Sequence, residues 1–187
     1  MRGFFQGETM KVCLLLANGF EELEAVGTFA LLKRAGLDVD LIALTSQDTT
    51  GRFGLCCTQL KPLSQSTTAS YDALVLPGGP GYQILEQSPE VKQLIEQFIA
   101  EGKLVAAICA SPTILGKRGY LKGKKYTCFT AMNEDFGGTF TGSYAETDGN
   151  IITGQSAAGT IDFAFAIIEK LLGKAKADEV KKKIYYK

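Results

Sequence analysis

Four short, mostly apolar runs constrain the fold of this chain more than any other feature. They are residues 11–17 (KVCLLLA), 39–44 (VDLIAL), 73–77 (ALVLP) and 104–108 (LVAAI). Runs of this length and composition are typical of strands that are buried on both faces. Because they alternate with amphipathic stretches, the chain is predicted to form an α/β fold with a mostly parallel sheet and helices on both faces.

The stretches between and after these runs predict the helices. Residues 21–35 carry apolar side chains at helical spacing and are followed by a glycine, which is a common helix end. Residues 89–101 follow a serine and begin with proline, as helix starts often do. Residues 159–172 are strongly periodic, and the lysine-rich residues 174–187 predict a surface helix. An Asp-Gly turn within residues 142–153 predicts a hairpin.

Composition narrows the possible functions. The 187 residues include 20 basic and 20 acidic side chains, so the formal net charge is zero, which disfavours nucleic-acid or membrane-surface binding. No apolar run has transmembrane length, and residues 1–9 lack a signal-peptide core, so a cytoplasmic location is expected. We interpret residues 10–187 as a single domain. Residues 1–9 are an N-terminal extension, a misassigned start or a cloning remnant, or else a short ordered arm.

The chain contains five cysteines and no histidine. An odd number of irregularly spaced cysteines is a poor disulfide framework and suits a reducing compartment. Without histidine, a Ser-His-Asp triad, a Cys-His dyad and nearly every catalytic zinc arrangement are excluded. No zinc spacing, phosphate loop or dinucleotide fingerprint is present, so we expect no metal and no cofactor. Any chemistry must use cysteine, carboxylates, hydroxyls and backbone N–H groups.

Cys109 is the strongest candidate for that chemistry. It follows the run 104–108 directly and precedes a predicted helix start, which places it on a sharp strand-to-helix turn. The helix N-terminus then favours a thiolate and can hold an oxyanion. Free cysteines are often buried and inert, but this position and the small neighbours Ala110 and Ser111 favour a reactive thiol. We expect its pKa to lie within the range of about 3.5–7.5 of activated cysteines.

Two other segments follow predicted strands and can converge with Cys109 at one sheet edge. Glu21 and Glu24 are three residues apart, so they share a helix face. A protonated Glu24 could donate a hydrogen bond to a thiolate, but spacing alone favours a solvated carboxylate that complements the helix dipole. Gly78 and Gly79 let the backbone approach a ligand closely and could complete an oxyanion pocket with the N–H of the residue after Cys109.

Together the segments GFEELEA, YDALVLPGG and AAICASP resemble the ThiJ/PfpI superfamily, most closely its DJ-one/ThiJ branch. The similarity extends from Met10 to about Leu172 and includes the later segments TGQ and GTIDF. The resemblance implies a single-domain, flavodoxin-like three-layer sandwich with a cysteine at a nucleophile elbow. It also implies a cytosolic homodimer.

The resemblance assigns roles to individual residues. Cys109 matches the family's oxidisable nucleophile, and Glu24 matches the acid that hydrogen-bonds its sulfur. Gly79 and Ala110 match the backbone donors of the oxyanion pocket. Residues near the pocket or the dimer interface are implied to be Glu21, Arg34, Arg52 and Cys57.

Two departures from the family pattern concern the pocket. Phe129 stands where some members have a histidine near the cysteine. The late loop reads Ser156-Ala157-Ala158 where related members usually have Gly-Pro. These departures weaken the case for hydrolysis more than the case for cysteine redox chemistry.

Two functions fit these residues. The first is a cofactor-independent glyoxalase or deglycase that acts on reactive aldehydes such as methylglyoxal, or on glycated thiols or amines. Cys109 would add to the aldehyde, and Glu24 would move the proton needed to reach a hydroxy acid. The alternative is a non-enzymatic redox sensor or chaperone-like protein that uses the same cysteine. Glutamine amidotransferase and protease activities are disfavoured because both need a histidine.

Overall fold

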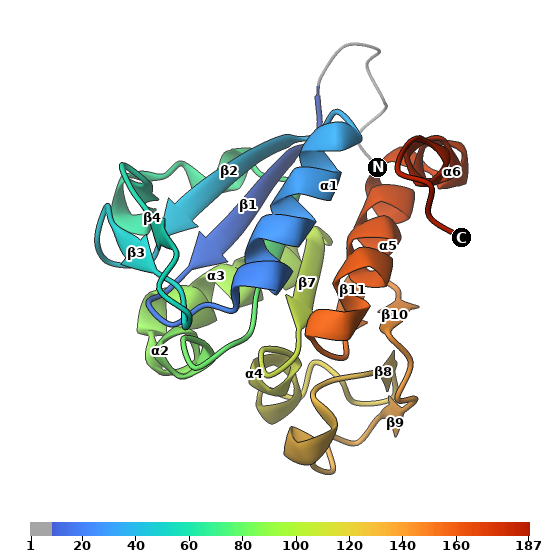
Figure 1. The fold of residues 1–187 in the computed structure, drawn as a ribbon. Helices are drawn as coiled ribbons and strands as arrows, with labels where there is room; N and C mark the ends of the chain where they lie inside the picture. The colour runs from blue at the N-terminus through green and yellow to red at the C-terminus, as the bar shows by residue number, and fades with distance from the viewer. Residues whose placement is uncertain (1–8) are drawn as a thin grey trace.

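A seven-stranded sheet forms the middle layer of the computed structural model, which describes residues 9–187 (Figure 1). In spatial order its strands are β10 (Ala145–Asp148), β11 (Ile151–Gly154), β7 (Leu104–Ile108), β6 (Ala73–Leu76), β1 (Lys11–Leu16), β2 (Asp38–Ala43) and β5 (Lys61–Pro62). Neighbouring strands pair in parallel, except for the antiparallel hairpin of β10 and β11. The predicted mostly parallel sheet and the Asp-Gly hairpin are therefore confirmed.

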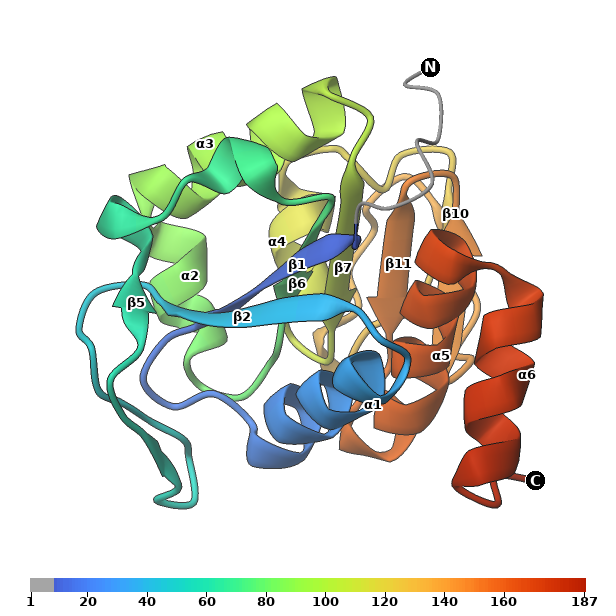
Figure 2. The ribbon, with the colours of Figure 1, turned by 90° about the horizontal axis from the view of Figure 1, so that it is seen from above.

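Helices cover both faces of the sheet, as Figure 2 shows. One face carries α1 (Thr28–Arg34), α5 (Thr160–Leu172) and α6 (Lys174–Lys183), and the other carries α2 (Tyr82–Gln87), α3 (Pro89–Ala100) and α4 (Pro112–Lys117). Side chains of β1 alternate between two buried clusters, with Leu14 and Leu16 in one and Cys13 and Leu15 in the other. The fold is a three-layer α/β sandwich, as predicted.

Shorter elements lie outside the central sheet. Two small sheets pair β3 (Thr49–Thr50) with β4 (Cys56–Cys57) and β8 (Lys125–Tyr126) with β9 (Thr139–Phe140). Single 3₁₀ turns are found at Leu63–Gln65, Thr68–Ser70, Thr130–Met132 and Ala157–Gly159. No helix of residues 9–187 has both the length and the apolar character needed to cross a membrane. Apart from Thr9, the predicted N-terminal extension lies outside the described residues.

The first predicted helix forms with a wider opening turn. Residues Leu23–Gly27 are π-helical, and α1 continues from there. The buried face includes Ala25, Thr28 and Leu32, which lie against the sheet and α5. The apolar side chains of Leu23 and Val26 are instead 55% and 41% exposed. Helical periodicity thus predicts this helix correctly, but only part of its apolar surface is buried within the chain.

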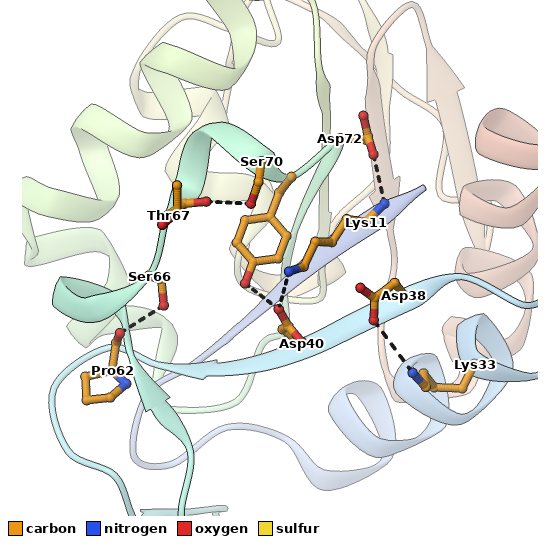
Figure 3. A network of polar contacts seen from close by, with 10 residues as sticks. Lys11, Lys33, Asp38, Asp40, Pro62, Ser66, Thr67, Ser70 and Asp72 are labelled. Carbon is orange, nitrogen blue, oxygen red and sulfur yellow. Dashed lines mark hydrogen bonds and ion pairs between the residues drawn. The ribbon is translucent and has the colours of Figure 1, made fainter. Parts of the chain in front are cut away.

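A network of polar contacts lies at the amino-terminal ends of the central strands of the sheet (Figure 3). The Tyr71 hydroxyl donates to Asp40 Oδ2 at 2.6 Å, and Lys11 Nζ lies 3.2 Å from the same oxygen. The Lys11 backbone N–H donates to Asp72 Oδ2 at 2.8 Å. Burial, followed by the bond to Asp40, raises the pKa of Tyr71, so this hydroxyl remains a donor. These contacts connect β1, β2 and the start of β6 at the amino-terminal ends of the strands, whereas Cys109 lies at their carboxyl ends.

Candidate active site

Three adjacent strands, β1, β6 and β7, bring the chemically interesting residues together at their carboxyl ends. Cys109 follows β7 directly and has φ = +65°, which is unusual for a residue other than glycine. Its N–H donates to the carbonyl oxygen of Gly154 at 2.9 Å, and its own carbonyl accepts from Phe129 N–H at 2.7 Å. These two bonds hold the strained residue between the strand and α4, with its thiol half-buried.

Backbone N–H groups from two loops meet at the Cys109 sulfur. The donors are Gly79, in the loop after β6, and Ala110, at the start of the turn into α4. The loop has to be glycine-rich, because a Cβ added at Gly78 would lie 2.7 Å from Cys109 Cβ and 2.8 Å from Glu24 Oε2. Two N–H groups that face one atom are compatible with the predicted oxyanion pocket, whose role stays a prediction.

Glu24 lies beside this thiol and is 1% exposed. Its Oε2 accepts a hydrogen bond from Gly78 N–H at 2.8 Å, and its carboxyl group interacts with the Cys109 thiol. Its Oε1 is buried and has no hydrogen-bond partner in the part of the chain that the structure describes. The solvated carboxylate favoured by spacing alone is therefore wrong, because the loop after β6 covers the first turn of the helix.

Glu21 supports the same turn. Its Oε2 accepts the backbone N–H of Glu24 at 2.8 Å, and its own N–H donates to the carbonyl oxygen of Gly78 at 3.0 Å. Its side chain is buried, at 8% exposure. The predicted shared helix face is not found, because Glu21 precedes the helical residues, which begin at Glu22. Glu21 instead caps the turn that carries Glu24, and Glu24 interacts with the thiol.

The thiol and the Glu24 carboxyl titrate as a coupled pair. Burial raises the pKa of Glu24 to about 7, against the opposing effect of the Gly78 N–H. Burial, and then the Glu24 charge, raise the pKa of Cys109 to about 12, although the N–H groups of Gly79 and Ala110 lower it. The first proton thus leaves the pair near pH 7, and the charge that remains opposes loss of the second.

The expected lowering of the Cys109 pKa is therefore wrong in direction. That expectation counted the backbone donors, which do favour the thiolate, but neither the burial nor the adjacent carboxylate. A protonated Glu24 removes the repulsion and supplies a donor. The singly ionised pair can consequently place its charge on sulfur or on oxygen, and the surrounding N–H groups stabilise either form.

The remaining predicted residues are divided between the site and more distant positions. Arg52 is exposed on the loop between β3 and β4, and its charge lowers the pKa of Glu24. Phe129 is 43% exposed and contacts Cys109 through its backbone. Arg34 lies in the last turn of α1, at the opposite end from Glu24, so it does not belong to the pocket of its own chain. A role for Arg34 at a dimer interface stays a prediction.

Cys57 lies in β4. It lines an apolar cavity of about 220 Å³, together with residues that include Phe20, Val26 and Phe29. Burial raises the pKa of its thiol. It is partly buried, and its predicted position near a dimer interface stays a prediction.

Two polar residues were not given roles by the sequence. Glu22 Oε1 accepts the backbone N–H of Phe53 at 2.6 Å, which ties the loop carrying Arg52 to the start of the helix. Ser111, noted only as a small neighbour of Cys109, is fully buried, and its Oγ donates to the carbonyl oxygen of Pro77 at 2.6 Å. No sequence signal identifies either bond, because the partners are 31 and 34 residues apart.

Comparison with known proteins places this geometry in a family context. The model of the DJ-1/PfpI family matches residues 10–170. Protein DJ-1 homolog A of Arabidopsis thaliana is 35% identical to this chain over 92% of its residues. The matched region covers 45% of the length of that relative, so this chain spans less than half of it. A deglycase of Thermococcus kodakarensis is 30% identical over 78% of this chain and 90% of its own length.

A solved structure supports the same relationship. The crystal structure of Drosophila melanogaster DJ-1beta matches with a TM-score of 0.89 and 30% sequence identity. The match covers 96% of this chain and all of that one.

Proposed function

Because the chain belongs to the DJ-1/PfpI family, we propose that it is a cofactor-independent enzyme that acts on reactive carbonyl compounds through Cys109. One observation carries the proposal: a buried carboxyl group with a raised pKa lies against a half-buried thiol that faces two backbone N–H donors. Relatives named as deglycases, among them that of Thermococcus kodakarensis, point to the same class of substrate. The proposed substrates are small aldehydes such as methylglyoxal, and thiols or amines that such aldehydes have glycated.

The proposed reaction begins with addition of the Cys109 sulfur to the aldehyde carbon. The hemithioacetal oxygen then carries the developing negative charge, and the N–H groups of Gly79 and Ala110, which face the sulfur, are its proposed donors. With methylglyoxal, the proton on the former aldehyde carbon moves to the adjacent carbonyl carbon, and the hydroxyl proton of the hemithioacetal moves to the oxygen of that carbonyl, which yields a thioester of lactate. Glu24 is the proposed carrier of that proton, because its pKa of about 7 lets it both accept and donate near neutral pH. Water then releases lactate and restores the thiol.

The test is lactate formation from methylglyoxal by the purified chain, without added metal or cofactor. We expect steady production that Cys109→Ser abolishes and that Glu24→Gln reduces by about a hundredfold or more, as loss of general acid–base catalysis does. Cys57→Ser is the matched control, since it removes a peripheral thiol. Equal activity of the Cys109→Ser variant would show that the turnover belongs to another group.

The same site favours a second candidate, a redox sensor. Oxidation of Cys109 to sulfinic acid would place new oxygens beside the Gly79 and Ala110 N–H groups and beside Glu24 Oε1, which has no hydrogen-bond partner among residues 9–187. Mass spectrometry after mild peroxide treatment tests this directly. Sulfinic acid at Cys109 without measurable lactate production would favour the sensor, and lactate production with an unoxidised thiol would favour the enzyme.

We also propose that the chain is a homodimer in the cytoplasm. The exposed apolar side chains of Leu23 and Val26 are three residues apart on one helix face and suit contact with a second copy. The five cysteines are unpaired, which suits a reducing compartment.

A further inference from the structure

The two N–H groups that face the Cys109 sulfur come from different segments of the chain. Gly79 belongs to the loop after β6, and Ala110 belongs to the turn after β7. Two donors stabilise one negative atom only when the distance between them is maintained, because hydrogen bonds weaken steeply when they are stretched or bent. A contact that links these segments therefore affects the site directly.

Most polar backbone groups of the loop after β6 already have other partners. Gly78 N–H donates to Glu24 Oε2, and the Gly78 carbonyl accepts from Glu21 N–H at 3.0 Å. The Gly79 carbonyl accepts from Tyr82 N–H at 3.0 Å. These bonds join the loop to the helix that carries Glu24 and to its own α2, and the Gly79 N–H is left to face the sulfur. None of them joins the loop to the segment that carries Ala110.

The side chain of Ser111 connects the loop after β6 to the segment that carries Ala110. Its hydroxyl donates at 2.6 Å to the carbonyl oxygen of Pro77, two residues before Gly79, and its own backbone N–H donates at 3.1 Å to the carbonyl oxygen of Ile108. The side chain has no exposed surface, so water does not compete for the bond. One buried hydroxyl thus connects the residue after Ala110 with the peptide that leads into Gly78.

We propose that Ser111 is a positioning residue that sets the distance between the two N–H donors of the oxyanion pocket through its hydrogen bond to Pro77. The proposal rests on the proposed role of Cys109 as the reacting group. Loss of the hydroxyl leaves the Pro77 carbonyl without this donor and lets the loop shift relative to the elbow. Gly79 and Ala110 then no longer converge on the same atom, and the thiolate loses stabilisation.

The experiment measures the rate at which iodoacetamide alkylates Cys109, followed by mass spectrometry across a pH series. The variants are Ser111→Ala, which removes the hydroxyl, and Ser111→Thr, which keeps it. Thr113→Val is the matched control, because the Thr113 hydroxyl is equally buried and donates at 2.7 Å to the carbonyl of Ala110 within its own turn, without reaching the loop. Melting temperatures of all variants record the purely structural effect.

We expect Ser111→Ala to slow alkylation by about tenfold and to move its pH profile to higher pH, a fraction of the loss that removal of a whole oxyanion donor causes. Ser111→Thr should stay within about twofold of the parent chain. Thr113→Val should lose stability without a change in the pH profile. A parent-like rate for Ser111→Ala, or an equal loss of rate for Thr113→Val, overturns the proposal.

If Ser111→Ala does not fold, the Cys109 alkylation rate of the Ser111→Thr variant tests the proposal. A folded Ser111→Thr protein with the parent rate supports the proposal, and one that is tenfold slower refutes it. Alkylation needs no aldehyde, so failure of the proposed enzymatic function, seen as absent lactate production, is recorded separately from failure of this inference.

Discussion

Replacement of Glu24 by glutamine should change how the stability of the protein depends on pH. The carboxyl has an ordinary pKa of 4.5 and a folded-state pKa of about 7, because it is buried. The folded chain therefore holds a proton that the unfolded chain releases between these two values. Its stabilising effect is complete below pH 4.5 and is lost as the pH rises through 7. At 1.36 kcal/mol for each pH unit, the loss amounts to about 3 kcal/mol.

Urea unfolding at pH 5 and at pH 8 measures this loss. The parent chain should lose about 2–3 kcal/mol more than Glu24→Gln between these conditions, because glutamine retains the acceptor for Gly78 N–H but does not titrate. The Cys109 thiol contributes little in this window, because burial raises its pKa to about 12. Glu96→Gln, at a side chain that is 67% exposed, controls for the loss of one negative charge. Identical pH slopes for the parent and Glu24→Gln would refute the raised carboxyl pKa.

Two further predictions concern surfaces and turns. Val26→Asp should convert the proposed dimer to a monomer, as measured by light scattering. Ile84→Asp, which replaces a 43% exposed residue on α2, should leave the dimer intact. A parent chain that is monomeric at micromolar concentration would contradict the dimer. Gly79→Ala should destabilise the chain by more than about 2 kcal/mol and slow Cys109 alkylation, because φ is +78° and the new Cβ would lie 2.6 Å from Glu21 N. Gly36→Ala is the control, because φ is +89° there and the new Cβ has open space around it. It should lower the stability by about 1–2 kcal/mol through backbone strain alone and leave Cys109 alkylation unchanged. Equal effects of the two variants would contradict the close approach of Gly79 to the backbone of Glu21.

The fold was predictable because its signals are local. The apolar run 104–108 specifies a buried strand, and the glycine and proline residues around residues 73–81 and 89–102 specify where elements end. A cysteine immediately after such a strand is placed at the carboxyl edge of the sheet by chain connectivity alone. The sequence therefore identifies the candidate site and the segments that meet there.

The burial of Glu24 could be decided only by the tertiary structure. The spacing predicts that Glu24 and Glu21 share a helix face, but it shows neither that Glu21 precedes the helix nor which neighbour covers Glu24. The loop after β6, 54 residues away, covers it and supplies the Gly78 hydrogen bond. Long-range packing also leaves Leu23 and Val26 exposed, although their spacing resembles that of core residues.

The electrostatics of Cys109 depend on the same long-range packing. Its helix-start position indicates a lowered thiol pKa, whereas burial and the adjacent Glu24 charge raise it to about 12. The Ser111–Pro77 bond is equally invisible in the sequence, since the partners are 34 residues apart and a serine at this position specifies no acceptor. The sequence by itself thus determines the strands, the turns and the position of the candidate nucleophile, Cys109. The tertiary structure decides the protonation of the Cys109 thiol and the alignment of the N–H groups that face it, because both depend on distances between segments that only folding brings together.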